Sequence, residues 1–141
     1  MNEARETLLM RIEEMWSMAW NYSICNLLEN VARLHNKFIS KDDIKGMTDE
    51  QWLNWLSDEP ELNTSVFWDP DREPGRVAEV MRELKGQWDA NPDMTLGTLL
   101  FAAVDRYSLK FSLYSIEDDQ LLRGLRAMGL AEKAQYRKSF G

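Results

Sequence analysis

The chain has 141 residues and a net charge of −7 at neutral pH, with 44% hydrophobic and 29% charged residues. These values fit one compact folded domain, or two small domains packed together, and they exclude an intrinsically disordered chain. A single cysteine and a single histidine exclude an intramolecular disulfide and the common zinc-binding motifs, and no apolar run approaches the roughly 20 residues that span a bilayer.

Two helices are predicted before residue 40, because apolar residues recur at helical spacing over residues 3–20 and 24–38. The apolar positions are Leu8, Leu9, Ile12, Met15, Trp16, Ala19, Ile24, Leu27, Leu28, Val31, Ala32 and Leu34. Ser23 or Asn21 is expected to cap the second helix, since a side-chain oxygen at this position accepts a hydrogen bond from the first turn.

A short third helix is predicted to begin at a capping box formed by Thr48 and Gln51 and to run through Leu56. Its buried face is expected to hold Trp52, Leu53, Trp55 and Leu56. Residues 58–75 follow as a linker or long loop, because they contain three of the four prolines and a dense set of acids.

The second half of the chain also shows helical spacing. A fourth helix is predicted from Pro74, which suits the first position of a helix, to about Asp89. After a turn that contains the remaining proline, Asp93 or Thr95 is expected to cap a fifth helix that runs to about Tyr107.

The last part of the chain is predicted to begin with a short extended piece over residues 110–115, where apolar and polar residues alternate. Ser115 is expected to cap a sixth helix that ends at Gly129, and a final short helix is predicted over 130–139. The sequence therefore predicts an all-α protein.

The two halves resemble each other. An offset of 72 aligns Trp16 with Trp88, Leu27 with Leu99 and Leu28 with Leu100, and an offset of 69 aligns Asp49 with Asp118, Gln51 with Gln120 and Leu56 with Leu125. Any two amphipathic helices can be slid into register, so chance similarity is the alternative. Three elements in the same order favour a tandem duplication of a three-helix unit, with residues 1–57 and 76–141 as the units and their apolar faces packed together.

The second unit also resembles a known family. It reads R-V-A-E-V-M-R-E-L-x-x-x-W-x-x-N-P-D-M-T-L-G-T-L-L, followed later by Y-S-I-E-D-D-Q-L-L-x-x-L. This pattern is similar to that of the YihD family of small helical bacterial and phage proteins. The matching positions are Trp88, Pro92, Asp93, Leu96, Gly97, Leu99, Leu100, Glu117, Asp118 and Leu122. The resemblance implies a helical fold and no particular chemistry, and the family's frequency in phages and mobile elements implies action on a host or defence component.

Candidate catalytic residues are few. The acids at 117–119 suit a metal site or a general acid and base, but negative charges in the first turn of a helix are stabilising by roughly 0.3–1 kcal/mol each and need no catalytic role. The same holds for the acids at 49–50. Cys25 is expected to be a buried small hydrophobe, and His35 is expected to solvate the end of a helix. With no phosphate-binding loop, nucleophile elbow or metalloprotease motif, we expect no enzyme activity, no metal and no cofactor.

The predicted partner-binding residues lie in the linker. Residues 40–75 hold ten acids and three bases, a net charge of −7, and they surround three adjacent large apolar residues. The predicted surface consists of Asp58, Glu59, Glu61, Val66, Phe67, Trp68, Asp69 and Asp71. The three apolar residues either tuck between the two units or stay exposed as an interface anchor. A Ca²⁺ site is disfavoured, since the acids lack EF-hand spacing.

We therefore expect a non-catalytic protein-binding module, encoded by a phage or mobile element, that occludes a basic face of a host or defence (CRISPR-like) protein. Three alternatives stay open: an acidic DNA mimic, a self-associating structural protein such as a homodimer, and a metal-dependent enzyme that uses the carboxylates. The basic residues of 120–141 suit a solvated last helix, and direct nucleic-acid binding is not expected of an acidic chain. The N-terminus lacks a signal-peptide core, so we expect a cytoplasmic protein.

Overall fold

The computed structural model describes residues 3–18, 22–57, 75–104 and 116–128, and within these ranges every regular element is a helix. The helices are α1 (Glu3–Met18), α2 (Ile24–His35), α3 (Lys41–Gly46), α4 (Asp49–Ser57), α5 (Arg76–Ala90) and α6 (Leu96–Val104). A further helix covers residues 118–128. The prediction of an all-α fold is confirmed. Among these helices, none combines the length and the apolar content needed to cross a bilayer.

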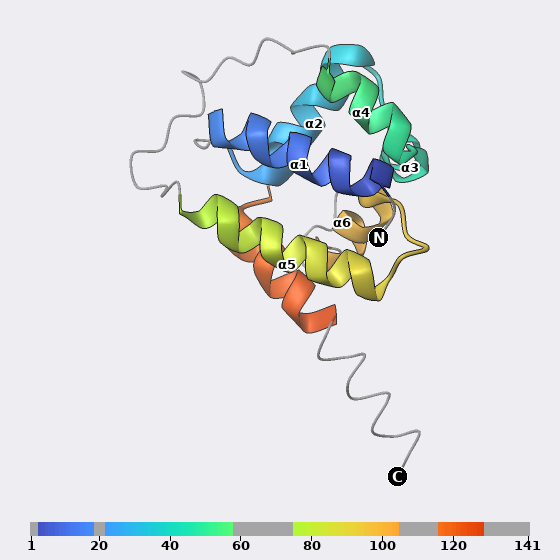
Figure 1. The fold of residues 1–141 in the computed structure, drawn as a ribbon. Coiled ribbons are helices and arrows are strands. Elements are labelled where there is room, and N and C mark those ends of the chain that lie inside the picture. Colours follow the sequence, from blue (N-terminus) through green and yellow to red (C-terminus); the bar gives the residue numbers. More distant parts are fainter. Residues whose placement is uncertain (1–2, 19–21, 58–74, 105–115, 129–141) are drawn as a thin grey trace.

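Helix α1 lies at the centre of the arrangement (Figure 1). It packs against α4 on one side and α5 on the other, and α2 also packs against α4. Helices α1 and α5 lie side by side and run in opposite directions, so the start of α1 meets the end of α5 (Figure 1). Arg5 makes the contact between these two helix ends. Its guanidinium lies 4.2 Å from the centre of the Trp88 ring and donates to the carbonyl of Pro92 over 2.8 Å.

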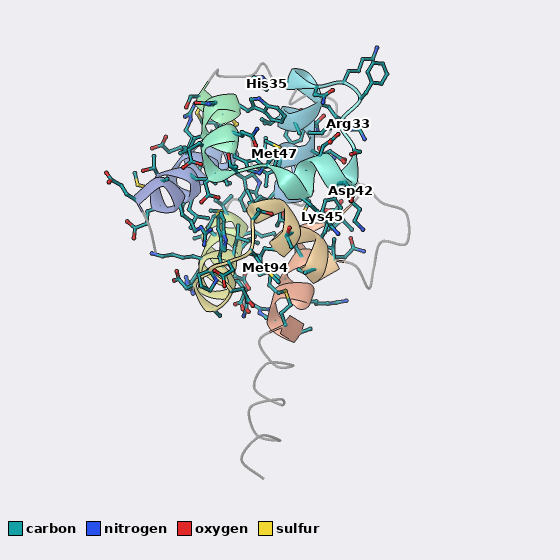
Figure 2. The ribbon with its side chains drawn as sticks, turned by 90° about the vertical axis from the view of Figure 1, so that its right-hand side faces the viewer. Arg33, His35, Asp42, Lys45, Met47 and Met94 are labelled. Carbon is teal, nitrogen blue, oxygen red and sulfur yellow. The ribbon has the colours of Figure 1, made fainter. Side chains whose placement is uncertain are left out.

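Helix α3 covers the beginning of α6 (Figure 2). The hydroxyl of Thr95, just before α6, donates to the carbonyl of Lys45 over 2.6 Å. Gly97 allows this close approach, since a Cβ at that position would collide with the backbone carbonyl of Ile44. A glycine in the first turn of α6 is therefore a packing requirement of the α3–α6 contact.

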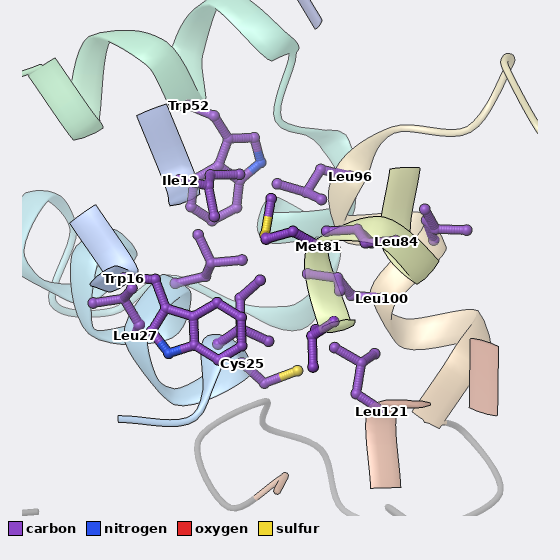
Figure 3. Close-up of a cluster of buried hydrophobic side chains, with 14 of the residues drawn as sticks. Ile12, Trp16, Cys25, Leu27, Trp52, Met81, Leu84, Leu96, Leu100 and Leu121 are labelled. Carbon is purple, nitrogen blue, oxygen red and sulfur yellow. The ribbon is translucent and has the colours of Figure 1, made fainter. Parts of the chain in front are cut away.

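One hydrophobic core serves the whole described structure (Figure 3). Trp16 of α1, Trp52 of α4 and Trp88 of α5 are the largest fully buried side chains. Leu100 of α6 and Leu121 of the last described helix belong to the same core. Helices from both predicted units thus bury their apolar faces together.

The indoles of Trp16 and Trp88 make equivalent hydrogen bonds. The Trp16 Nε1–H donates to the carbonyl of Tyr22 over 2.9 Å, and the Trp88 Nε1–H donates to the carbonyl of Met94 over 2.8 Å. In both cases the acceptor lies six positions after the tryptophan. Each bond ties the end of a long helix to the turn that follows it.

The helices after these turns begin in the same way. The Ser23 hydroxyl accepts from the N–H of Asn26, and the Thr95 hydroxyl accepts from the N–H of Thr98, each over 3.1 Å. These pairs and the tryptophan pairs follow the offset of 72 found in the sequence comparison. The duplication of a three-helix unit, and the division into 1–57, 58–75 and 76–141, stay predictions.

The helix starting at Asp49 and the helix starting at residue 118 also share a cap. The N–H of Thr48 and the N–H of Glu117 each donate over 2.9 Å to a glutamine three positions later, Gln51 or Gln120. The predicted capping box of Thr48 and Gln51 is confirmed, because the N–H of Gln51 also donates to the Thr48 hydroxyl over 3.2 Å.

Several predicted boundaries are wrong. Helix α2 ends at His35 and not at residue 38, because Asn36 has an extended backbone. Helix α5 begins at Arg76, after Pro74, and the last described helix begins at 118, whereas its predicted cap, Ser115, lies outside the described residues. The predicted ends and elements at 105–115 and 129–139 lie outside the described residues.

Two further corrections concern the α2–α4 region. Helix α3 was not predicted, and it begins with a capping box in which Ser40 and Asp43 exchange hydrogen bonds over 3.1 Å and 3.0 Å. Leu34, predicted in the apolar stripe, is 57% exposed. Trp52 and Leu56 are fully buried as predicted, whereas Leu53 and Trp55 are only partly buried.

Candidate interaction surface

The connection from α2 to α3 is fixed at both ends. At the end of α2 the N–H of Asn36 donates to the carbonyl of Ala32 over 2.8 Å, and the Asn36 side-chain oxygen accepts from the N–H of Phe38 over 3.2 Å. The N–H of Ile39 donates to the Asn36 carbonyl over 3.1 Å, and Ser40 begins the capping box of α3. These bonds define the path of residues 36–40.

This path places Phe38 in solvent. Ile39 is buried in the core and is only 7% exposed, whereas the adjacent Phe38 is 86% exposed. Residues 37 and 38 form a turn that the hydrogen bond from the Ile39 N–H to the Asn36 carbonyl closes, and this turn leaves Phe38 outside while Ile39 enters the core. Phe38 cannot enter the core without breaking the bonds of Asn36 or withdrawing Ile39.

Leu34 lies one turn before this connection and is 57% exposed. Together with the neighbouring polar residues it forms a continuous exposed stretch, which we call the α2–α3 surface and define as Arg33, Leu34, His35, Lys37 and Phe38. Arg33 and His35 lie on the same side of the molecule as α3 (Figure 2). A pair of exposed large apolar side chains in a polar border is the arrangement of an interface anchor.

The α2–α3 surface is positively charged in a chain of net charge −7. Residues 30–41 contain Arg33, Lys37 and Lys41 and no acid. The Lys37 ammonium lies 5.9 Å from the centre of the Phe38 ring, and the Lys41 ammonium lies 4.9 Å from the ring of Phe101. Each lysine therefore lies near an aromatic ring, and Lys37 is the base beside Phe38.

His35 joins this surface to α4. Its ring stacks on Trp55 with centroids 4.9 Å apart and planes within 1° of parallel. Its Nε2 lies 3.2 Å from the carbonyl oxygen of Trp55, and because a carbonyl can only accept, the proton of this hydrogen bond belongs to Nε2. His35 is the exposed last residue of α2, as expected, and the structure adds its contacts with Trp55 of α4.

The acids considered as catalytic candidates have structural contacts. Asp118 is buried and accepts from the N–H of Ile24 over 3.0 Å, and its second oxygen lies 4.0 Å from Arg76. Asp49 lies 3.3 Å from the Nε of Arg5. Among the described residues, no group of three or more His, Cys, Asp or Glu side chains is placed to hold a metal ion.

Cys25 is completely buried, as predicted. Burial raises the pKa of its thiol well above the ordinary value, and the nearby carboxylates of Asp118, Glu29 and Glu117 raise it further. Its thiol therefore stays protonated at neutral pH. Glu29 of α2 is also buried, which was not predicted. Its carboxylate lies 3.8 Å from the guanidinium of Arg33, one helical turn later.

The eight predicted partner-binding residues lie outside the described residues. They are Asp58, Glu59, Glu61, Val66, Phe67, Trp68, Asp69 and Asp71. The α2–α3 surface was not predicted, because Leu34 and Phe38 are four positions apart. This spacing is typical of one buried helical face and led to the prediction that the helix continues to residue 38. Asn36 between them was the available signal, since asparagine is favoured beside helix ends and in turns.

Comparison of the chain with protein-family models, with curated proteins and with solved structures finds no match. The resemblance of residues 76–125 to the YihD family therefore stays a prediction.

Proposed function

We propose that the chain is a non-catalytic protein-binding module whose α2–α3 surface binds an acidic segment of a partner protein. The observation that carries the proposal is the 86% exposure of Phe38 on a connection whose backbone hydrogen bonds direct it outward. Burying such a side chain in an interface is worth roughly 1.5–3 kcal/mol. Aromatic and arginine side chains supply most of the binding energy in typical interfaces.

The charge of the surface selects the class of partner. Lys37 lies beside Phe38, and Arg33, which is 3.8 Å from Glu29, adds a second base to the α2–α3 surface, so a partner with carboxylates around an apolar pocket is favoured over a basic one. The proposal retains the expected mode of action, occlusion of a host or defence protein by a phage or mobile-element product. It places the anchor on Leu34 and Phe38, and the acidic residues of 58–71 remain a second proposed contact for a basic face.

The test compares the proteins retained from bacterial lysate by immobilised wild type and by the double variant Leu34→Ser/Phe38→Ser, at low and high salt. The matched control is Met18→Ser, because Met18 is an equally exposed apolar residue (83%) at the end of α1. We expect a partner that binds wild type and Met18→Ser and is lost with the double variant. A partner retained equally by all three proteins would contradict the α2–α3 surface as the anchor.

Salt dependence separates this proposal from the DNA-mimic alternative. An interface anchored by Leu34 and Phe38 should weaken only modestly as salt rises, since apolar burial is not screened. A DNA mimic should lose nearly all of its affinity, because each carboxylate that replaces a phosphate acts through screened charge.

A further inference from the structure

A groove lies between α1 and α5 on the surface of the molecule. Its volume is about 540 Å³, and its floor is formed by Leu9 and Met81, which are nearly buried. Met10 stands at its edge and is 61% exposed. The groove therefore offers an apolar strip along two long helices.

The two walls of the groove carry opposite charges. Glu6 and Glu13 line it from α1, and Arg82 and Lys85 line it from α5. All four side chains are exposed, and none of them forms an ion pair with another described residue. An acidic wall faces a basic wall, and both are available to a partner.

We propose that this groove is the interface of a homodimer, in which each copy lays its α1 over the α5 of the other. Most homodimers have a two-fold axis, and the same surface then meets itself. An axis along the groove exchanges the two walls, so the acids of one copy face the bases of the other. An axis across the groove would place acids on acids, and the charges exclude it.

The helix directions fix which residues meet. Helices α1 and α5 are antiparallel (Figure 1). Glu6 is near the start of α1 and Lys85 is near the end of α5, so both belong to the same end of the groove that they line. With the axis along the groove, Glu6 of one copy faces Lys85 of the other, and the contact occurs twice. Met10 of each copy is covered by the other copy's groove, and its flexible thioether adapts to the opposing surface.

The test is the molar mass in solution, measured by light scattering after size exclusion and by sedimentation equilibrium over a range of concentrations. We expect a dimer for wild type. Glu6→Lys and Lys85→Glu should each weaken it, because each variant creates two like-charge contacts per dimer; we expect the dissociation constant to rise about tenfold or more.

Mixing provides the decisive comparison. In a mixed dimer of Glu6→Lys and Lys85→Glu each altered residue meets an opposite charge, so an equimolar mixture should regain the dimer, and so should the double variant. Lys37→Glu, a charge reversal on the α2–α3 surface, is the matched control and should leave the dimer unchanged. A wild type that stays monomeric at high concentration, or a dimer that neither reversal weakens, would overturn the proposal. Loss without recovery on mixing would also overturn it, with far-UV circular dichroism confirming that each variant is folded.

Discussion

The backbone N–H of Ile24 donates to a carboxylate oxygen of Asp118 over 3.0 Å, across 94 positions of the chain. The neighbouring Ser23 hydroxyl donates to the carbonyl of Ile116 over 2.7 Å, so the start of α2 is tied to the start of the last described helix. Both bonds are buried. Asp118 is thus a cap for a helix in the other half of the molecule.

Replacing Asp118 should therefore destabilise the fold. Asp118→Ala leaves the N–H of Ile24 buried without its acceptor, which costs about 1–3 kcal/mol of unfolding free energy. Asp118→Asn keeps an acceptor oxygen and should cost less. The exposed neighbour Asp119 is the matched control, and Asp119→Ala should change the stability by less than about 0.5 kcal/mol. Urea unfolding measures all three, and equal effects of the two alanine variants would refute the capping role.

Gly97 and Gly86 should respond in opposite ways to alanine. Gly97→Ala places a methyl group against the carbonyl of Ile44 and should cost about 1–3 kcal/mol, because the backbone of α3 must shift. Gly86 lies on the exposed side of α5 with open space around it, so Gly86→Ala should stabilise by about 0.5–1 kcal/mol through helix propensity. Thermal or urea unfolding gives both values. A neutral Gly97→Ala would show that α3 is not held against α6.

The three buried indoles should differ in their tolerance of phenylalanine. Trp16→Phe and Trp88→Phe each lose a hydrogen bond to a backbone carbonyl, whereas the Nε1 of Trp52 has no hydrogen-bond partner in the described structure. All three lose similar volume, so Trp52→Phe should cost less than the other two by about 1 kcal/mol. Denaturant unfolding of the three variants measures the difference, and a Trp52→Phe variant as unstable as the others would contradict it.

Cys25 should make stability fall at alkaline pH. Its pKa is raised in the folded state, so the folded protein keeps a proton that the unfolded chain loses above about pH 8.5. The stabilising contribution is fully present below that pH and is lost as pH rises toward the folded pKa, by up to about 1.4 kcal/mol per pH unit. Comparing the pH dependence of unfolding for wild type and Cys25→Ala isolates this contribution. The native thiol should also be unreactive toward a disulfide reagent at neutral pH, and rapid labelling would indicate an open interior.

Asp43 should titrate below its ordinary range. The backbone N–H and the hydroxyl of Ser40 both hold the pKa of this carboxyl down. Its contribution to stability is therefore present above the unfolded value of about 3.9 and is lost as pH falls through the folded pKa. Carboxyl NMR titration should show the low value in wild type and a rise in Ser40→Ala. An unchanged Asp43 titration in that variant would show that the Ser40 hydroxyl does not lower this pKa.

Local sequence signals predicted most of the helices because their starts are encoded by nearby side chains. Ser23 and the Thr48–Gln51 pair cap helices as expected. Helix α3 escaped prediction because its six residues contain one buried apolar side chain, Ile44, and a single position shows no period. Its capping box, Ser40 with Asp43, was present in the sequence but was not followed by an apolar run.

The candidate surface was less accessible to prediction. Phe38 is exposed because Asn36 ends α2 and Ile39 enters the core. Hydrophobic spacing alone predicts neither the end of the helix nor the burial of Ile39. The cap that Asp118 gives to Ile24 depends on a contact across the chain, which leaves no local pattern. Gly97 was noted as part of a motif, but its packing reason required the position of α3.

The hydrogen bonds between the two halves of the chain form in a fixed order as the protein is synthesised on the ribosome. Helix α6 meets the Lys45 carbonyl, which has already been made when Thr95 emerges. The first turn of α2 has only the local cap of Ser23 until Ile116 and Asp118 emerge, most of the chain later. During synthesis the start of α2 therefore lacks both of these bonds until residue 118 has emerged, and a chain truncated before residue 116 lacks them altogether.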